Sequence, residues 1–135
     1  MVTRRALLGA GVLALAGCGP PDEPEIDPKQ VLGEQLRLTN AAAAALGDAG
    51  ANAQARARRL TAALERAGGS VPDAVGRPSD PLEAVRAELV GHVRAVGLLG
   101  EAEYRELFAG LIASAAPDEA ALISPPEMTA FPGTP

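Results

Sequence analysis

The sequence predicts an all-α protein built as an antiparallel four-helix bundle. Four segments of the 135-residue chain repeat apolar residues every three or four positions, which is the spacing of one helix face. Asp-Pro and Gly-Gly pairs bound these segments, as helix starts and stops do. No segment alternates apolar and polar residues in the manner of a strand. Because the segments are similar in length and the connections are short, we expect one bundle within residues 29–123.

The first two predicted helices are separated by a single glycine. One runs from about Pro28 to Leu46, with Asp27 as its N-cap and proline in its first position. The next runs from about Asp48 to Ala67, and Gly68-Gly69 ends it. The expected inward residues are Leu32, Leu36, Thr39, Ala43 and Leu46 in the first helix, and Ala53, Ala57, Leu60, Leu64 and Ala67 in the second.

The other two predicted helices follow a loop at residues 70–79. The third begins at Asp80-Pro81 and ends within Gly97–Gly100, and the fourth covers about Glu101 to Ala116. Pro117 is expected to stop or kink the fourth helix, with residues 118–123 able to add a turn or two. The expected inward residues are Leu82, Val85, Leu89, Val93 and Val96, then Tyr104, Leu107, Phe108, Leu111, Ile112 and Ala115.

The segment before the helices has the layout of an export signal. Arg4 and Arg5 precede the apolar run 6–16, which is too short to span a bilayer as a helix. Leu15-Ala16-Gly17-Cys18 at the end of this run resembles the signal of a bacterial lipoprotein. The resemblance implies that residues 1–17 are removed and that Cys18 carries a lipid on its sulfur. It also implies an exported protein, anchored to the outer side of the cell membrane by a diacylated cysteine.

Two further features of the export segment and its flanks bear on localisation. Thr3-Arg4-Arg5-Ala6-Leu7-Leu8 resembles a twin-arginine signal, and this leaves the export route open between that pathway and the general one. Residues 18–28 are rich in proline and acidic residues, and we expect them to form an extended tether. Residues 124–135 are rich in proline and are expected to be a disordered tail.

Charge and composition exclude some classes of function. The chain has a formal net charge of −5 and one lysine, Lys29, so a nucleic-acid partner is not expected. Its one cysteine, Cys18, leaves no intramolecular disulfide. Ser114 and Tyr104 have no sequence neighbours that would activate a nucleophile, and no glycine-rich phosphate loop follows a strand. We therefore expect no enzyme activity.

Two stretches of the sequence combine apolar residues with glycines at particular spacings. One is Leu60-x-x-Ala63-Leu64-x-x-x-Gly68-Gly69-x-x-Pro72. The other is Leu107-Phe108-Ala109-Gly110-Leu111-Ile112-Ala113-Ser114, followed by Glu119-Ala120-Ala121-Leu122. Together with the order of elements (two helices, a loop containing prolines and two more helices), these stretches resemble actinobacterial secreted proteins with a ferritin-like domain. The resemblance implies a ferritin-like bundle.

The same resemblance argues against the metal chemistry of that fold. A two-iron site in a ferritin-like bundle takes a glutamate from each of two helices and Glu-x-x-His from the other two. This chain has no Glu-x-x-His. The corresponding positions fall at Ala53 and Arg56 on one helix and at Ala115 and Asp118 on another. We therefore expect neither a metal nor another cofactor.

The remaining candidate residues have ordinary structural interpretations. Glu88 and His92, the only histidine, are four residues apart, and we expect an exposed or flanking contact between them. Arginines 56, 58 and 59 are expected to be solvated. Three glutamates match the dipole at the start of the fourth helix and its exposed face, namely Glu101, Glu103 and Glu106.

These observations predict a lipid-anchored envelope protein with a non-catalytic helical bundle. Its partners would be the membrane, through Cys18, and an envelope protein. One alternative is a metal- or redox-linked protein with a partial site at Glu34, Glu88 and His92. Another is a carrier of a small apolar ligand, held inside the bundle near Tyr104 and Phe108.

Overall fold

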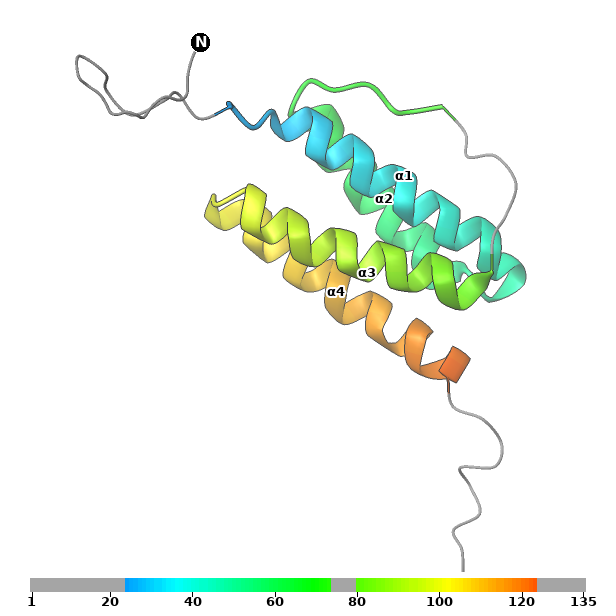
Figure 1. Cartoon of the computed structure of the whole chain (residues 1–135). Coiled ribbons are helices and arrows are strands. Elements are labelled where there is room, and N and C mark those ends of the chain that lie inside the picture. Colours follow the sequence, from blue (N-terminus) through cyan, green and yellow to red (C-terminus); the bar gives the residue numbers. More distant parts are fainter. Residues whose placement is uncertain (1–23, 74–79, 124–135) are drawn as a thin grey trace, which may run out of the picture.

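The computed structural model describes residues 24–73 and 80–123, and these form a helical bundle without strands (Figure 1). The elements are α1 (Pro28–Leu46), η1 (Gly47–Ala49), α2 (Ala51–Arg66), α3 (Pro81–Leu98) and α4 (Ala102–Ile123). The prediction of an all-helical chain is confirmed for these residues. None of the described helices has the length and hydropathy required to cross a membrane. The predicted signal 1–17, Cys18 and the tail 124–135 lie outside the described residues.

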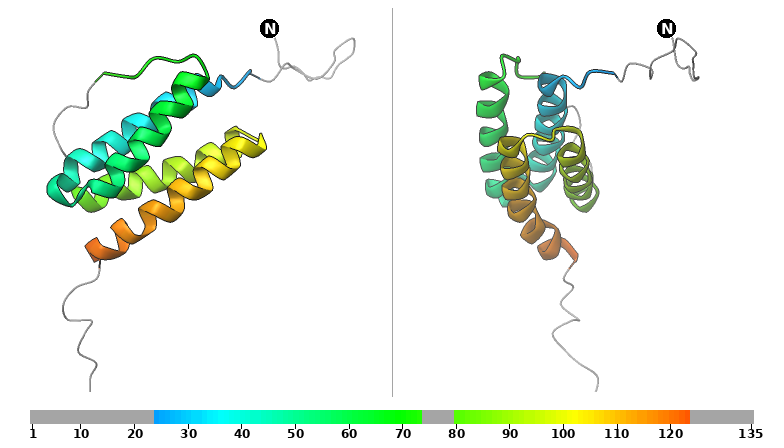
Figure 2. Two further views of the ribbon diagram at one scale, coloured as in Figure 1. Left: turned by 180° about the vertical axis from the view of Figure 1, so that it is seen from behind. Right: turned by 90° about the vertical axis from the view of Figure 1, so that its left-hand side faces the viewer.

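The four helices form two layers, with α1 and α2 in one and α3 and α4 in the other (Figure 2). Contact between the layers is extensive along α1 and α3 and more limited between α2 and α4. The side chains that meet across α1 and α3 run in opposite order along the two helices: Gln35 meets His92, and Thr39 meets Glu88. The chain enters the bundle at the start of α1, beside the end of α3 (Figure 1).

The predicted starts of α1 and α3 are confirmed. Asp27 and Asp80 are N-caps whose carboxylates accept hydrogen bonds at 3.0 Å from the backbone N–H of Lys29 and Glu83, respectively. Proline occupies the first turn of each helix, where a backbone N–H would have no partner in the helix.

The connection between α1 and α2 differs from the prediction, because the second helix begins at Ala51 and not near Asp48. Gly47 has a positive φ of 58° that favours glycine, and η1 follows it. A Cβ at Gly50 would lie 2.9 Å from the carbonyl oxygen of Ala43, so this turn needs a residue without a side chain.

Helix α4 continues past Pro117 to Ile123, which is the longer of the two outcomes expected for this proline. The residues that follow the proline are held by other helices. Asp118 accepts a hydrogen bond from Arg56, and Glu119 forms an ion pair with Arg86. These contacts offset the loss of one backbone hydrogen bond at Pro117.

The apolar core fills the half of the bundle nearest the chain entry. Its buried members come from all four helices and the α3–α4 connection: Leu32, Leu36, Leu60, Ala63, Leu64, Ala95, Leu99, Phe108 and Leu111. Most of the residues predicted to face inward on α1, α2 and α4 are buried or partly buried.

The predicted inward face of α3 is only partly correct. Val85 is fully buried as predicted, and Leu82, Leu89 and Val96 are partly buried, but Val93 is 60% exposed. The buried residues are Ala84, Val85, Glu88, Gly91, His92 and Ala95. The helix is therefore rotated so that two polar side chains point inward, where they meet hydrogen-bonding partners.

Candidate functional site

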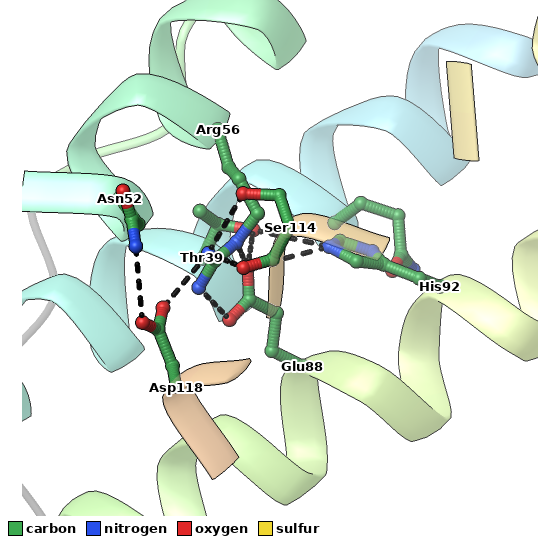
Figure 3. Close-up of polar contacts among 8 residues, drawn as sticks. Thr39, Asn52, Arg56, Glu88, His92, Ser114 and Asp118 are labelled. Atoms are coloured by element: carbon green, nitrogen blue, oxygen red, sulfur yellow. Dashed lines mark hydrogen bonds and ion pairs between the residues drawn. The ribbon is translucent and has the colours of Figure 1, made fainter. Parts of the chain in front are cut away.

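A group of polar side chains lies inside the bundle, on the far side of the apolar core from the chain entry. We call it the Arg56 cluster (Figure 3). All four helices contribute to it, and its members are Gln35, Thr39, Asn52, Arg56, Glu88, His92, Ser114 and Asp118. Arg56, Glu88, His92 and Thr39 are each 0–1% exposed. A buried charge is costly unless it is paired and hydrogen-bonded, so the contacts of this cluster decide whether it is stable.

The centre of the cluster is a two-pronged ion pair between α2 and α3. Arg56 Nε donates to Glu88 Oε1 at 2.7 Å, and Arg56 Nη2 donates to Glu88 Oε2 at 2.9 Å. This parallel pairing is the strong geometry for a guanidinium and a carboxylate. Thr39 Oγ1 donates a further hydrogen bond to Glu88 Oε1 at 2.9 Å.

The third nitrogen of the guanidinium reaches α4. Arg56 Nη1 donates to Asp118 Oδ2 at 2.9 Å, to the Ser114 carbonyl at 3.1 Å and to Ser114 Oγ at 3.3 Å. Asn52 Nδ2 donates to the other Asp118 oxygen at 3.4 Å. Arg56 therefore joins two carboxylates on different helices, and all three of its nitrogens are bonded.

His92 extends the network from Glu88 toward α1. Its Nδ1 lies 2.9 Å from Gln35 Oε1, and its Nε2 lies 3.4 Å from Glu88 Oε1 and 3.5 Å from Thr39 Oγ1. The ring also lies 5.7 Å from that of Phe108, centroid to centroid, so one face of it belongs to the apolar core. His92 thus connects the apolar and polar halves of the bundle.

Gly91 permits the contact between Gln35 and His92. A Cβ at this position would lie 2.5 Å from Leu38 Cδ1 and 2.8 Å from Gln35 Oε1. Both contacts are shorter than real Cβ atoms tolerate, so a side chain here would displace the Gln35 amide. The glycine lets α1 approach α3 closely enough for the amide to reach the imidazole.

Charge pairing fixes the ionisation of the central pair. Burial raises the pKa of Glu88, but hydrogen bonds from His92, Arg56 and Thr39 and the charge of Arg56 outweigh it and hold that pKa below its ordinary value. Burial also lowers the pKa of Arg56, but Glu88 and Asp118 outweigh it and raise that pKa. Both residues are therefore charged at neutral pH.

Several site predictions are corrected by this geometry. Glu88 and His92 were expected to be exposed or flanking, and both are fully buried. Arg56 was expected to be solvated, and it is buried, whereas Arg58 and Arg59 are exposed as predicted.

A spacing signal for this cluster was present in the sequence. Ala53, Arg56 and Leu60 are three and four residues apart, which places them on one helix face. Val85, Glu88, His92 and Ala95 repeat the pattern on α3. Arg56, Glu88 and His92 therefore share their helix faces with buried apolar residues.

The partial metal site proposed from Glu34, Glu88 and His92 is not assembled. Glu34 is exposed and forms an ion pair with Arg37 at 2.6 Å. The carboxylate that does approach the cluster is Asp118, and Arg56 holds it. Among the described residues, no three His, Cys, Asp or Glu side chains are grouped so that they could hold a metal ion.

The two-iron set implied by a ferritin-like fold does not fit these residues. A metal ion at the centre of the cluster would need the oxygens that now accept hydrogen bonds from Arg56. It would also lie against the positive charge of the guanidinium, which repels a cation. In this cluster the positive charge that faces both carboxylates is that of Arg56.

The other candidate residues are surface residues or small contacts. Glu101, Glu103 and Glu106 are exposed at the start of α4. A hollow of about 80 Å³ lies beside Tyr104 and Leu107, small for the pockets of about 300–1,000 Å³ that hold organic ligands. Phe108 does not line it, since it is buried in the apolar core.

Comparison of the whole chain with family models, with curated proteins and with solved structures finds no match.

Proposed function

We propose that this chain is a lipid-anchored protein of the cell envelope. Its exported domain is an antiparallel, ferritin-like four-helix bundle with a binding or structural role and no catalytic centre. The observation that carries the non-catalytic part is the Arg56 cluster. The buried charges of Arg56 and Glu88 neutralise one another, and all three guanidinium nitrogens are hydrogen-bonded.

The cluster is suited to hold four helices in one register. Each of its central bonds joins different helices: α2 to α3 through Glu88, α2 to α4 through Asp118, and α1 to α3 through His92. A fully bonded polar group in a core favours the one packing that satisfies it. We therefore assign the cluster a structural role and place the protein's binding surfaces outside it.

The proposal for metal content is tested by elemental analysis of the full chain purified without chelator. We expect far less than one iron, zinc or manganese per chain, because a lone Glu88–His92 pair offers fewer than the three protein ligands of a typical zinc enzyme. A metal near one per chain that is lost in His92→Ala would overturn the non-catalytic assignment and favour the metal-linked alternative.

The proposal of a lipid anchor rests on Leu15-Ala16-Gly17-Cys18. We expect Cys18→Ala to leave the precursor uncut or to release the protein from the membrane fraction, and intact mass should show a diacylated cysteine in the native chain. Ala16→Gly is a matched control that keeps a small residue before the cleavage site. Normal cutting and anchoring of Cys18→Ala would contradict the proposal.

The envelope partner is proposed to be a protein or the membrane itself. Nucleic acid is not proposed, because the chain is acidic overall.

A further inference from the structure

The exposed side of α3 carries three large apolar side chains. After Glu83, the exposed residues of α3 are Arg86, Ala87, Val90, Val93, Arg94, Gly97 and Leu98, and we call these the outward face of α3. Val90, Val93 and Leu98 are 55%, 60% and 45% exposed. Large apolar side chains exposed together on one helix mark an interaction surface.

The unpaired charge on this face is the positive charge of Arg94, although the chain as a whole is acidic. From Arg86 to Leu98 the only acidic residue is Glu88, and it is buried in the Arg56 cluster. Arg94 makes no ion pair with any described residue, and Arg86 pairs only with Glu119 of α4. Apolar residues interleaved with arginine on a helix are typical of helices that lie on anionic membranes.

The outward face continues into a groove at the chain-entry end. This groove, of about 270 Å³, lies between α1 and α3 and is lined by Gln30, Val31, Glu34, Gln35, Leu38, Gly91, Arg94, Ala95 and Leu98. Ile26, which is 42% exposed, precedes α1 at the same end. Apolar surface is therefore concentrated on the side of the bundle that the tether reaches first.

The length of the tether allows this face to reach the membrane. Pro28 is ten positions after Cys18, so an acylated Cys18 lies at most about 35 Å from the start of α1. Helix α3 has 18 residues and is about 27 Å long. The anchor can thus hold the full length of α3 against the bilayer surface.

We propose that the outward face of α3 docks on the anionic lipid surface of the membrane to which the chain is anchored. The inference rests on the proposed lipid anchor. Val90, Val93 and Leu98 enter the headgroup region, and the guanidinium of Arg94 pairs with lipid phosphate.

The test uses single-cysteine labels on the full acylated chain. Because acylation blocks the sulfur of Cys18, a fluorophore reacts only with a new cysteine at Val93→Cys on α3 or at Ala62→Cys, an exposed control position on α2. Helix α2 is a matched control because its exposed face carries Arg58, Arg59 and Arg66 but no large apolar residue. The protein is reconstituted into phosphatidylcholine vesicles, with or without phosphatidylglycerol, that carry a lipid-bound quencher.

We expect quenching of about twofold or more at Val93→Cys in the anionic vesicles, since docked side chains lie about 5–10 Å deep. We expect little quenching at Ala62→Cys. Val90→Asp together with Arg94→Glu should abolish the quenching at Val93→Cys while the protein stays anchored.

Two outcomes would overturn the docking. Equal quenching of both labels would show a bundle that tumbles freely on its tether. Protection of Val93→Cys that needs no anionic lipid but depends on protein concentration, with cross-linking between copies, would assign the face to a second chain. Failure of the proposed anchor is seen separately, as a mature chain whose mass shows no lipid on Cys18.

Discussion

The two halves of the bundle are stabilised by different interactions: apolar packing in one, and buried ion pairs and hydrogen bonds in the other. In the half near the chain entry, leucines from α1, α2 and α4 and Phe108 pack without polar atoms. In the other half the apolar contribution comes from Ala42, Ala84 and Val85, and the space between the helices is filled by the Arg56 cluster. Burial of apolar area stabilises the first half and tolerates several packings. The second half contributes less apolar area, but its bonds are satisfied in one arrangement only.

The comparison is tested most strongly by removing Arg56. We expect Arg56→Ala to destabilise the protein by about 3–5 kcal/mol, because Glu88 would remain as a buried charge without its partner. Arg58→Ala, two residues away and exposed, should change the free energy of unfolding by less than about 0.5 kcal/mol. Urea unfolding of the two variants measures both values.

A double variant separates the pair from its surroundings. Arg56→Met with Glu88→Leu removes both charges and fills the space with apolar atoms, so it should be more stable than Arg56→Ala alone. If Arg56→Ala and Arg58→Ala lose equal stability, the cluster does not hold the second half of the bundle.

Truncating buried leucines in the apolar half should lower the free energy of unfolding. Leu64→Ala and Leu111→Ala remove fully buried side chains, and each should cost about 2–5 kcal/mol. Leu89→Ala is the informative partner, because Leu89 is only partly buried and should cost less than either. Three equal urea midpoints would mean that the face of α3 is misplaced.

Leu89 also shows where reasoning from the sequence succeeds and where it fails. Helix starts are local: an Asp side chain caps the helix that a following Pro begins, so the bounds of α1 and the start of α3 could be predicted. The inward faces of α1, α2 and α4 could be predicted as well, since apolar residues there recur at helical spacing. On α3, Val93 fits the same helical spacing as the buried Val85, and hydrophobicity alone does not identify Glu88 and His92 as inward residues.

The Arg56 cluster could not be predicted because its partners are distant in the sequence. Arg56 and Glu88 are 32 residues apart, and Arg56 and Asp118 are 62 apart. Each residue taken alone is best explained as a solvated charge. Burial of these charged groups becomes favourable only when three helices bring them together. The sequence of a single helix does not contain that information. A polar residue at an inward helical position is the available signal, and it identifies the site without identifying the partner.

Lowering the pH should reduce the free energy of unfolding through Glu88, which belongs to the polar half of the bundle. The pKa of Glu88 is lower in the folded protein than its ordinary value of 4.5, so the unfolded chain takes up a proton more readily. The stability from this group is therefore complete above that value and is lost as the pH falls below it, by at most about 1.4 kcal/mol per pH unit.

Urea midpoints measured from pH 7 to pH 3 test this prediction. Glu88→Gln should flatten the acid slope, because the group that titrates is gone. Leu64→Ala is the control, since it should lower stability at every pH and leave the slope as in the native chain. An unchanged slope in Glu88→Gln would assign acid sensitivity to other carboxylates.

The smallest effect is expected at an ion pair that shares one distance with the buried pair but has a single contact and is more exposed. Arg86 and Glu119 also join two helices, with the same 2.7 Å between Nε and a carboxylate oxygen as Arg56 and Glu88. The Arg86 side chain is 54% exposed and that of Glu119 is 28% exposed, so water and salt screen the attraction. A double-mutant cycle with Arg86→Ala and Glu119→Ala should give a coupling energy below about 1 kcal/mol, and 1 M salt should remove most of it. Removing one partner leaves the other in water, so neither single variant should approach the loss in Arg56→Ala. A coupling as large as that of the buried pair would show that distance, and not burial, sets the strength of these bonds.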